Sequence, residues 1–264
     1  MGAGERGRRT SRIGGHALRY LTEQPRAGRV VSRFRCGFNV LLDEDTDPGF
    51  VSIQTPEAAM HPWGVEVSGG RTDASIGTRC RVDEDVLHVE NSLKIGVSEA
   101  VVTDLSISPY SAEQTTCAQG RIPSLVGVLG SLLEPLDRVI GSMLRRWHES
   151  GDAATLCDLL GLGTGSTPAG DDVLVGVLGG LAALGKAKGG CVSWAKNLRA
   201  RTSLPSAQMI AAALDGAFPE PLGNLIVELP SAEEQRRECL VGELVDLGAS
   251  SGRMMLRGVI AAFG

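Results

Sequence analysis

The spacing of apolar residues changes partway along this chain, and that change limits the folds open to it. Between Val30 and Leu42 apolar side chains recur on even positions with polar ones between them, a period of two typical of a half-buried strand. From Pro123 to Trp147 apolar residues recur at helical spacing instead. Strands followed by helices predict the α+β class.

The first half carries further short extended runs separated by turn-forming residues. These runs cover residues 50–54, 64–67, 78–82, 86–89 and 93–107. Their spacing predicts antiparallel hairpins in a small barrel or sandwich, followed by a mostly helical C-terminal half. We expect a flexible Arg/Gly-rich tail over residues 1–27, a β-rich domain over 28–117 and a helical domain over 118–264.

The helical half contains a segment from Asp171 to Leu184 that is apolar all round, which predicts a central buried helix with glycines that admit close neighbours. Pro135 is expected to split or kink the helix before it. Ser231 and Glu234 have the spacing of a capping box and predict the start of a later helix. The final helix is expected at about residues 253–262.

Composition argues against two classes of partner. The net charge is −5 and aromatic residues make up 4% of the chain, which disfavours nucleic-acid binding even though residues 1–35 hold nine arginines. The longest apolar run is far shorter than the roughly 20 residues of a membrane span. The six cysteines are widely separated and form no metal-binding spacing. We therefore expect a cytoplasmic protein with reduced thiols and no membrane or nucleic-acid partner.

The most informative segment is the glycine-rich loop from Gly161 to Gly170. Its four glycines leave backbone N–H groups uncovered, and Thr167 before Pro168 predicts an N-cap that leads into the buried helix. Bare amides and hydroxyls at a helix N-terminus favour binding of an anion. The loop lacks the Lys-Ser/Thr of a Walker loop and the third glycine of a dinucleotide fingerprint.

Asp171 and Asp172 follow this loop and admit two interpretations. As acids of a first helical turn they would complement the helix dipole. Alternatively they act in catalysis, holding Mg²⁺ or accepting hydrogen bonds from a substrate amide or ammonium group. The apolar helix beyond them places both carboxyls near the interior, where each needs a partner, and this favours the functional interpretation.

Two further helix starts, near Thr202 and near Ser251, are also rich in hydroxyl groups. Each by itself is explained by ordinary capping, whereas together with the glycine loop they could surround one ligand. The candidate binding residues are Gly163, Thr164, Gly165, Ser166, Thr167, Gly170, Thr202, Ser206, Ser251 and Gly252.

These residues resemble a bacterial family whose best-known member is the AllH-type subunit of oxamate carbamoyltransferase. The segment from Gly161 to Gly176 reads Gly-Leu-Gly-Thr-Gly-Ser-Thr-Pro-Ala-Gly-Asp-Asp-Val-Leu-Val-Gly, close to the family's Gly-Leu-Gly-x-Gly-Leu-Thr-Pro-Ser-Gly-Asp-Asp-Phe-Leu-x-Gly. Weaker matches begin at Thr202 and at Gly248. The chain departs from the family at Ala249 and Met254, where His and Asp are common.

The resemblance implies a protein of purine or allantoin nitrogen catabolism that works with other subunits. In that system carbamoyl phosphate exchanges its carbamoyl group with oxamate or a related amide. Two hypotheses follow. Either the chain is a component of a carbamoyltransferase-type enzyme that binds a small anionic substrate, with Mg²⁺ as a candidate cofactor, or it is a non-catalytic assembly or regulatory subunit whose glycine loop is structural.

Overall fold

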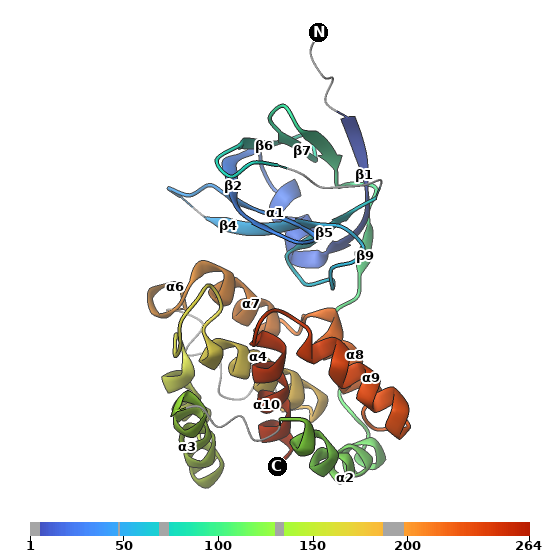
Figure 1. Cartoon of the computed structure of the whole chain (residues 1–264), viewed down its shortest axis with the longest axis vertical. Helices are drawn as coiled ribbons and strands as arrows, with labels where there is room; N and C mark the ends of the chain where they lie inside the picture. The colour runs from blue at the N-terminus through green and yellow to red at the C-terminus, as the bar shows by residue number, and fades with distance from the viewer. Residues whose placement is uncertain (1–5, 47, 69–73, 130–134, 187–197) are drawn as a thin grey trace. The chain divides into compact units, whose positions relative to one another are not determined.

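The structure is a computed structural model that describes residues 6–46, 48–68, 74–129, 135–186 and 198–264. The chain divides into two compact units, Met1–Leu105 and Ser106–Gly264 (Figure 1). This division lies earlier than the boundary at residue 117 that we expected. The first unit is built from strands and the second from helices, which confirms the predicted α+β class.

The described part of the N-terminal unit contains nine strands and one helix. The strands are β1 Arg6–Gly14, β2 Arg26–Phe34, β3 Gly37–Leu42, β4 Gly49–Gln54, β5 Gly64–Val67, β6 Arg79–Asp83, β7 Val86–Val89, β8 Leu93–Gly96 and β9 Val101–Thr103. They form one sheet in the order β5-β4-β3-β2-β6-β7-β8-β1-β9, and a further pairing of β5 with β1 shows that the sheet curls. The unit therefore has the barrel-like character that the hairpin pattern predicts.

Most neighbouring strands run antiparallel, as predicted, but β1 pairs in parallel with β8 and β9, and β4 pairs in parallel with β5. The run Val30–Leu42, read as one strand, is a hairpin of β2 and β3 that turns at Arg35 and Cys36. Next to this turn, facing residues have opposite parity, as in the pair Arg33 and Phe38, but a register shift between Val30 and Ser32 places Val30 opposite Val40. The buried positions are therefore even on both strands, and alternation alone cannot reveal the turn.

Part of the segment expected to be a flexible tail is ordered in this unit. Strand β1 ends at Gly14 and helix α1, Gly15–Thr22, follows it directly. Ile13, Ala17 and Leu21 are almost fully buried in the core of the sheet. A few apolar side chains at the right spacing therefore outweigh the surrounding arginines and glycines.

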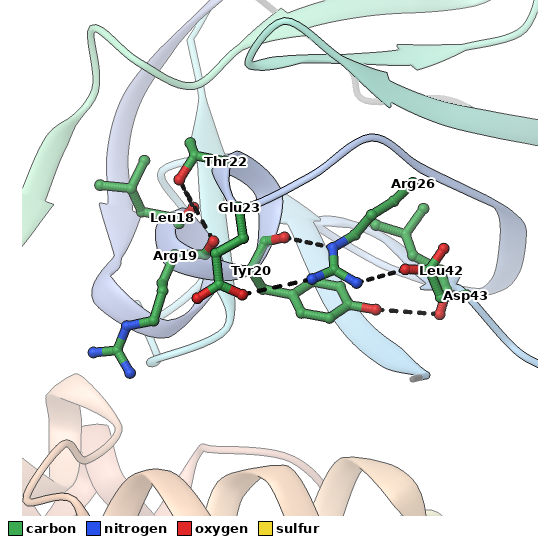
Figure 2. A network of polar contacts seen from close by, with 8 residues as sticks. All are labelled: Leu18, Arg19, Tyr20, Thr22, Glu23, Arg26, Leu42 and Asp43. Carbon is green, nitrogen blue, oxygen red and sulfur yellow. Dashed lines mark hydrogen bonds and ion pairs between the residues drawn. The ribbon is translucent and has the colours of Figure 1, made fainter. Parts of the chain in front are cut away.

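A buried arginine ties helix α1 to the sheet (Figure 2). The side chain of Arg26, at the start of β2, is only 2% exposed. Its Nε donates to the carbonyl oxygen of Tyr20 at 2.6 Å and its Nη1 to Oδ2 of Asp43 at 2.5 Å. The guanidinium also lies over the Tyr20 ring, 3.5 Å from its centroid, and Glu23 supplies a second carboxylate at 3.7 Å. Arg26 is thus a fully paired structural residue.

The helices of the C-terminal unit surround a buried centre. They are α2 Ala112–Leu129, α3 Pro135–Ser150, the 3₁₀ helix η1 Ala153–Leu159, α4 Ala169–Ala183, α6 Leu198–Arg201, α7 Leu204–Leu214, α8 Glu220–Glu228, α9 Glu234–Val245 and α10 Ser251–Phe263. No helix in the described part of the chain is long and apolar enough to cross a lipid bilayer. Asp152 caps η1, because its side chain accepts a hydrogen bond from the backbone N–H of Ala154.

Helix α4 is the central buried helix that the sequence predicts. Every residue from Gly170 to Ala183 is buried, and α10 packs closely along it (Figure 1). The two backbones approach through glycines: a Cβ on Gly176 would lie 1.9 Å from the Met255 carbonyl oxygen, and one on Gly258 would lie 2.1 Å from that of Val173. This close packing fixes the start of α10 relative to the start of α4.

Two predicted helix starts are wrong. Helix α9 begins at Glu234 after Glu233, and the Ser231 hydroxyl donates back to the Glu228 carbonyl oxygen instead of capping it. The described chain does contain a reciprocal cap, at the start of α2, where the Ser111 hydroxyl accepts from the Gln114 backbone and the Gln114 side chain accepts from the Ser111 backbone. Helix α2 therefore begins well before Pro123, which lies inside it.

Candidate anion-binding site

The loop between η1 and α4 is held against the starts of two other helices. The Ser203 hydroxyl, at the N-cap of α7, donates to the carbonyl oxygen of Ser166 at 2.5 Å. The hydroxyl groups of Thr167 and Ser251, the first residue of α10, lie 3.1 Å apart. The three hydroxyl-rich helix starts that the sequence singles out therefore converge in the structure.

The outer part of the loop presents free backbone donors. Gly163, Thr164, Gly165 and Ser166 are exposed, and no group in the described residues accepts a hydrogen bond from their N–H groups. Gly165 has a φ of +97°, a conformation that favours glycine, and no atom crowds the place where a Cβ would stand. These amides adjoin the positive end of the 15-residue helix α4, an arrangement that attracts anions.

Asp171 holds this arrangement together from inside. Its side chain is buried, its Oδ1 accepts from the backbone N–H of Gly161 at 2.8 Å, and its Oδ2 accepts from the Thr202 hydroxyl. Both carboxylate oxygens therefore already have protein donors, one from the loop and one from the segment before α7. Asp171 therefore links the loop to the segment before α7.

Asp172 is different, although it is next in sequence. It is 4% exposed, and its Oδ2 has no hydrogen-bond partner in the described structure. Burial raises the pKa of this carboxyl from 3.8 to about 7, a hydrogen bond from Ser251 opposes the shift, and the charge of Asp171 adds to it. The two side chains diverge, as adjacent positions on a helix must, and only Asp172 keeps an unpartnered oxygen.

The remaining candidate residues fall into two groups. The buried Ser206 hydroxyl has no partner in the described residues and so resembles Asp172. In contrast, the N–H groups of Gly170 and Gly252 already donate to the carbonyl oxygens of Leu162 and Leu247. A Cβ at either glycine would lie within about 2 Å of a carbonyl oxygen, so close packing explains both.

Thr167 does not cap α4 as predicted. Pro168 occupies the N-cap position and no side chain caps it, because the Thr167 hydroxyl faces Ser251. Sequence reasoning also left Ser203 out of the candidate residues, although its hydroxyl both caps α7 and holds the loop. The signal was present in the Ser-Leu-Pro pattern, which is typical of an N-cap followed by proline in the first turn.

The described residues contain no group of three or more His, Cys, Asp or Glu side chains placed to hold a metal ion. Magnesium, however, often binds through one or two carboxylates together with substrate phosphate and water. Asp172 is the carboxylate here with an oxygen still free.

Comparison with known proteins gives two family matches. Residues 9–108 match the family described as AllH family N-terminal domain. Residues 159–263, which contain the glycine loop and the starts of α4, α7 and α10, match the family described as Oxamate carbamoyltransferase subunit AllH. No curated protein and no solved structure gives a match. With both of its units matched in this way, the chain belongs to the AllH family.

Proposed function

We propose that this chain is the component of a carbamoyltransferase-type enzyme of purine or allantoin nitrogen catabolism that binds the anionic substrate. The substrate would bind through its phosphate or carboxylate group at the loop Gly163–Thr167. The family description, a subunit of oxamate carbamoyltransferase, supports an assembly with other subunits and a substrate that carries both an anion and an amide.

One observation carries this proposal: the exposed N–H groups of the loop have no acceptor in the described residues, and they adjoin the start of a long buried helix. The starts of α7 and α10 add their own positive ends at the same place, since their hydroxyl groups contact the loop. Backbone donors in this arrangement suit phosphate and carboxylate oxygens alike.

Asp172 would contact the other end of the substrate. Its free oxygen can accept a hydrogen bond from the amide nitrogen of a carbamoyl or oxamate group. With a pKa of about 7, the carboxyl is neutral in part of the population at neutral pH, which reduces its repulsion of a nearby anion. The same free oxygen makes Asp172 the candidate ligand of a Mg²⁺ ion bound together with substrate phosphate.

Carbamoyl transfer places negative charge on the carbamoyl oxygen as the nucleophile attacks the carbon. Donors held in place before the reaction stabilise that charge without further reorganisation. The loop amides and the unpartnered hydroxyl of Ser206 are the donors that this chain offers. Asp171 would act indirectly, by fixing Gly161 and Thr202 so that these donors keep their positions.

Calorimetry with carbamoyl phosphate, oxamate and inorganic phosphate, with and without Mg²⁺, tests the proposal. Thr164→Glu places a negative charge on the exposed loop, and Thr164→Gln is its neutral control. We expect the Glu variant to weaken binding of every anion at least about tenfold and the Gln variant to bind as the wild type does. Absence of binding heat with all three ligands in the wild type would refute the proposal.

A second variant separates the two ends of the substrate. Asp172→Asn should weaken binding of carbamoyl phosphate and oxamate, which carry an amide, and leave inorganic phosphate unaffected. Equal losses for all three ligands would contradict the assignment of Asp172 to the amide.

The alternative function, a non-catalytic assembly or regulatory subunit, is favoured by the two hydrogen bonds of Asp171. Through them, one of the two adjacent acids contributes to the packing of the loop. In that case Asp171→Asn would lower the melting temperature or weaken subunit assembly, while the wild type would bind no small anion.

A further inference from the structure

A hollow of about 360 Å³ lies on the N-terminal unit, within the size range of small-molecule sites. Its lining comes from β6, β7 and the residue after β7: Arg79, Cys80, Arg81, His88 and Glu90. Along β6 the residues Cys80 and Val82 are buried, whereas Arg79 and Arg81 are exposed. The two arginines therefore project from the face of the sheet opposite its core.

Positive and titratable side chains from neighbouring strands continue across this face. In the strand register Arg81 lies opposite His88, and His88 lies opposite Lys94 of β8. On the other side, Arg79 lies opposite Arg29 of β2. Like charges at directly opposite positions destabilise a sheet. A chain whose net charge is −5 thus places several basic side chains on one face of this sheet.

The two arginines of the hollow also differ from their neighbour in their pairing. Nη2 of Arg29 donates to both carboxylate oxygens of Glu44, at 2.7 and 2.8 Å, and its Nε donates to Oε2 at 3.2 Å. Within the described residues no carboxylate lies within ion-pair distance of Arg79 or Arg81. Two guanidinium groups on one wall of the hollow are therefore available to a ligand.

We propose that this hollow is a second binding site, separate from the glycine loop, for a small phosphorylated molecule. Guanidinium groups match phosphate oxygens with paired, charge-assisted hydrogen bonds, and residues two apart on a strand lie roughly 7 Å apart on one face, so both can reach one phosphate. His88 faces the same space, and Glu90 can accept a hydrogen bond from a hydroxyl or amino group elsewhere on the ligand.

Binding at the hollow can be followed through the imidazole resonances of His88 in the NMR spectrum of the full chain. Because His88 lines the hollow, these resonances report binding there and not binding at the glycine loop. The ligands are ribose 5-phosphate, which carries phosphate and hydroxyl groups, and succinate, a dicarboxylate without phosphate. The titrations are made at about 0.15 M salt, which screens weak surface attraction. Arg81→Gln removes one wall of the site, and Arg35→Gln is a control with the same charge change at an exposed turn outside the hollow.

We expect ribose 5-phosphate to shift the His88 resonances with saturation, Arg81→Gln to weaken that binding at least about tenfold, and Arg35→Gln to leave it unchanged. A titration without saturation, or an equal loss in both variants, would overturn the site. Equal or tighter binding of succinate would overturn its assignment to phosphorylated ligands.

Discussion

The buried carboxyl of Asp172 should make the stability of this protein depend on pH. Burial raises its pKa from 3.8 to about 7 in the folded chain. As pH rises through this interval, the unfolded chain releases the proton first and the folded chain retains it. Folding stability contributed by the neutral carboxyl is therefore present below about pH 4 and is lost by about pH 7. The shift corresponds to a loss of about 4 kcal/mol.

Asp172→Asn removes the titrating group and keeps the shape of the side chain. The variant should resemble the wild type in free energy of unfolding near pH 4, and exceed it by up to about 4 kcal/mol at pH 8. Urea unfolding at several pH values, followed by far-UV circular dichroism of the helices, measures this difference. Asp158→Asn, at a surface ion pair with Arg146, is the control and should show no such rise.

A difference between Asp172→Asn and the wild type that stays constant from pH 4 to pH 8 would refute the reasoning. It would mean that the carboxyl reaches water or a positive charge in solution. A carbon NMR titration of the labelled aspartate side chains, which reports the pKa of Asp172 directly, would distinguish these causes from compensation elsewhere.

Three further changes test the packing and the polar contacts by thermal or urea unfolding. Gly176→Ala should destabilise the chain by about 3 kcal/mol, because its Cβ would lie 1.9 Å from a carbonyl oxygen of α10. The control, Gly242→Ala in α9, places its Cβ in open space and should be neutral or stabilising. Equal effects of the two substitutions would contradict the close packing of α4 and α10. Asp43→Asn should lower the free energy of unfolding by about 3 kcal/mol, because it removes the charge partner of the buried Arg26. A loss below about 1 kcal/mol would show that water reaches the Arg26 guanidinium. Thr202→Val should cost about 2 kcal/mol, because it leaves the buried Oδ2 of Asp171 without its donor, whereas Thr202→Ser keeps the hydroxyl and should retain stability. Equal stability of the two variants would show that the hydroxyl contributes nothing.

The features predicted correctly are those that depend on nearby residues. The apolar run after Asp172 can satisfy its side chains only in the interior, so the buried helix α4 follows from composition alone. The glycine loop before it is recognisable for a similar local reason, since its glycines and hydroxyls alternate within ten residues. The order of strands and helices follows from periodicity in the same way.

The errors arise where two local patterns are equally good. Ser231 with Glu234 and Ser111 with Gln114 have the same capping spacing, but only the second pair forms the reciprocal cap. The choice depends on where each helix packs, which neither four-residue pattern contains. The Arg/Gly-rich segment 1–27 was expected to be flexible throughout, but its residue Ile13 is buried in the core of the sheet. Its polar neighbours in the sequence do not reveal this tertiary contact.

The sequence alone determined that two acids follow a glycine-rich loop and enter a buried helix. Tertiary structure decided which of them has an oxygen to offer a ligand. Asp171 receives the hydroxyl of Thr202, 31 residues away, and the loop's own backbone, whereas Asp172 faces Ser251 and keeps one oxygen free. Donors this distant reach a carboxyl only after the helices have packed, so adjacent and chemically identical residues acquire different roles through the fold.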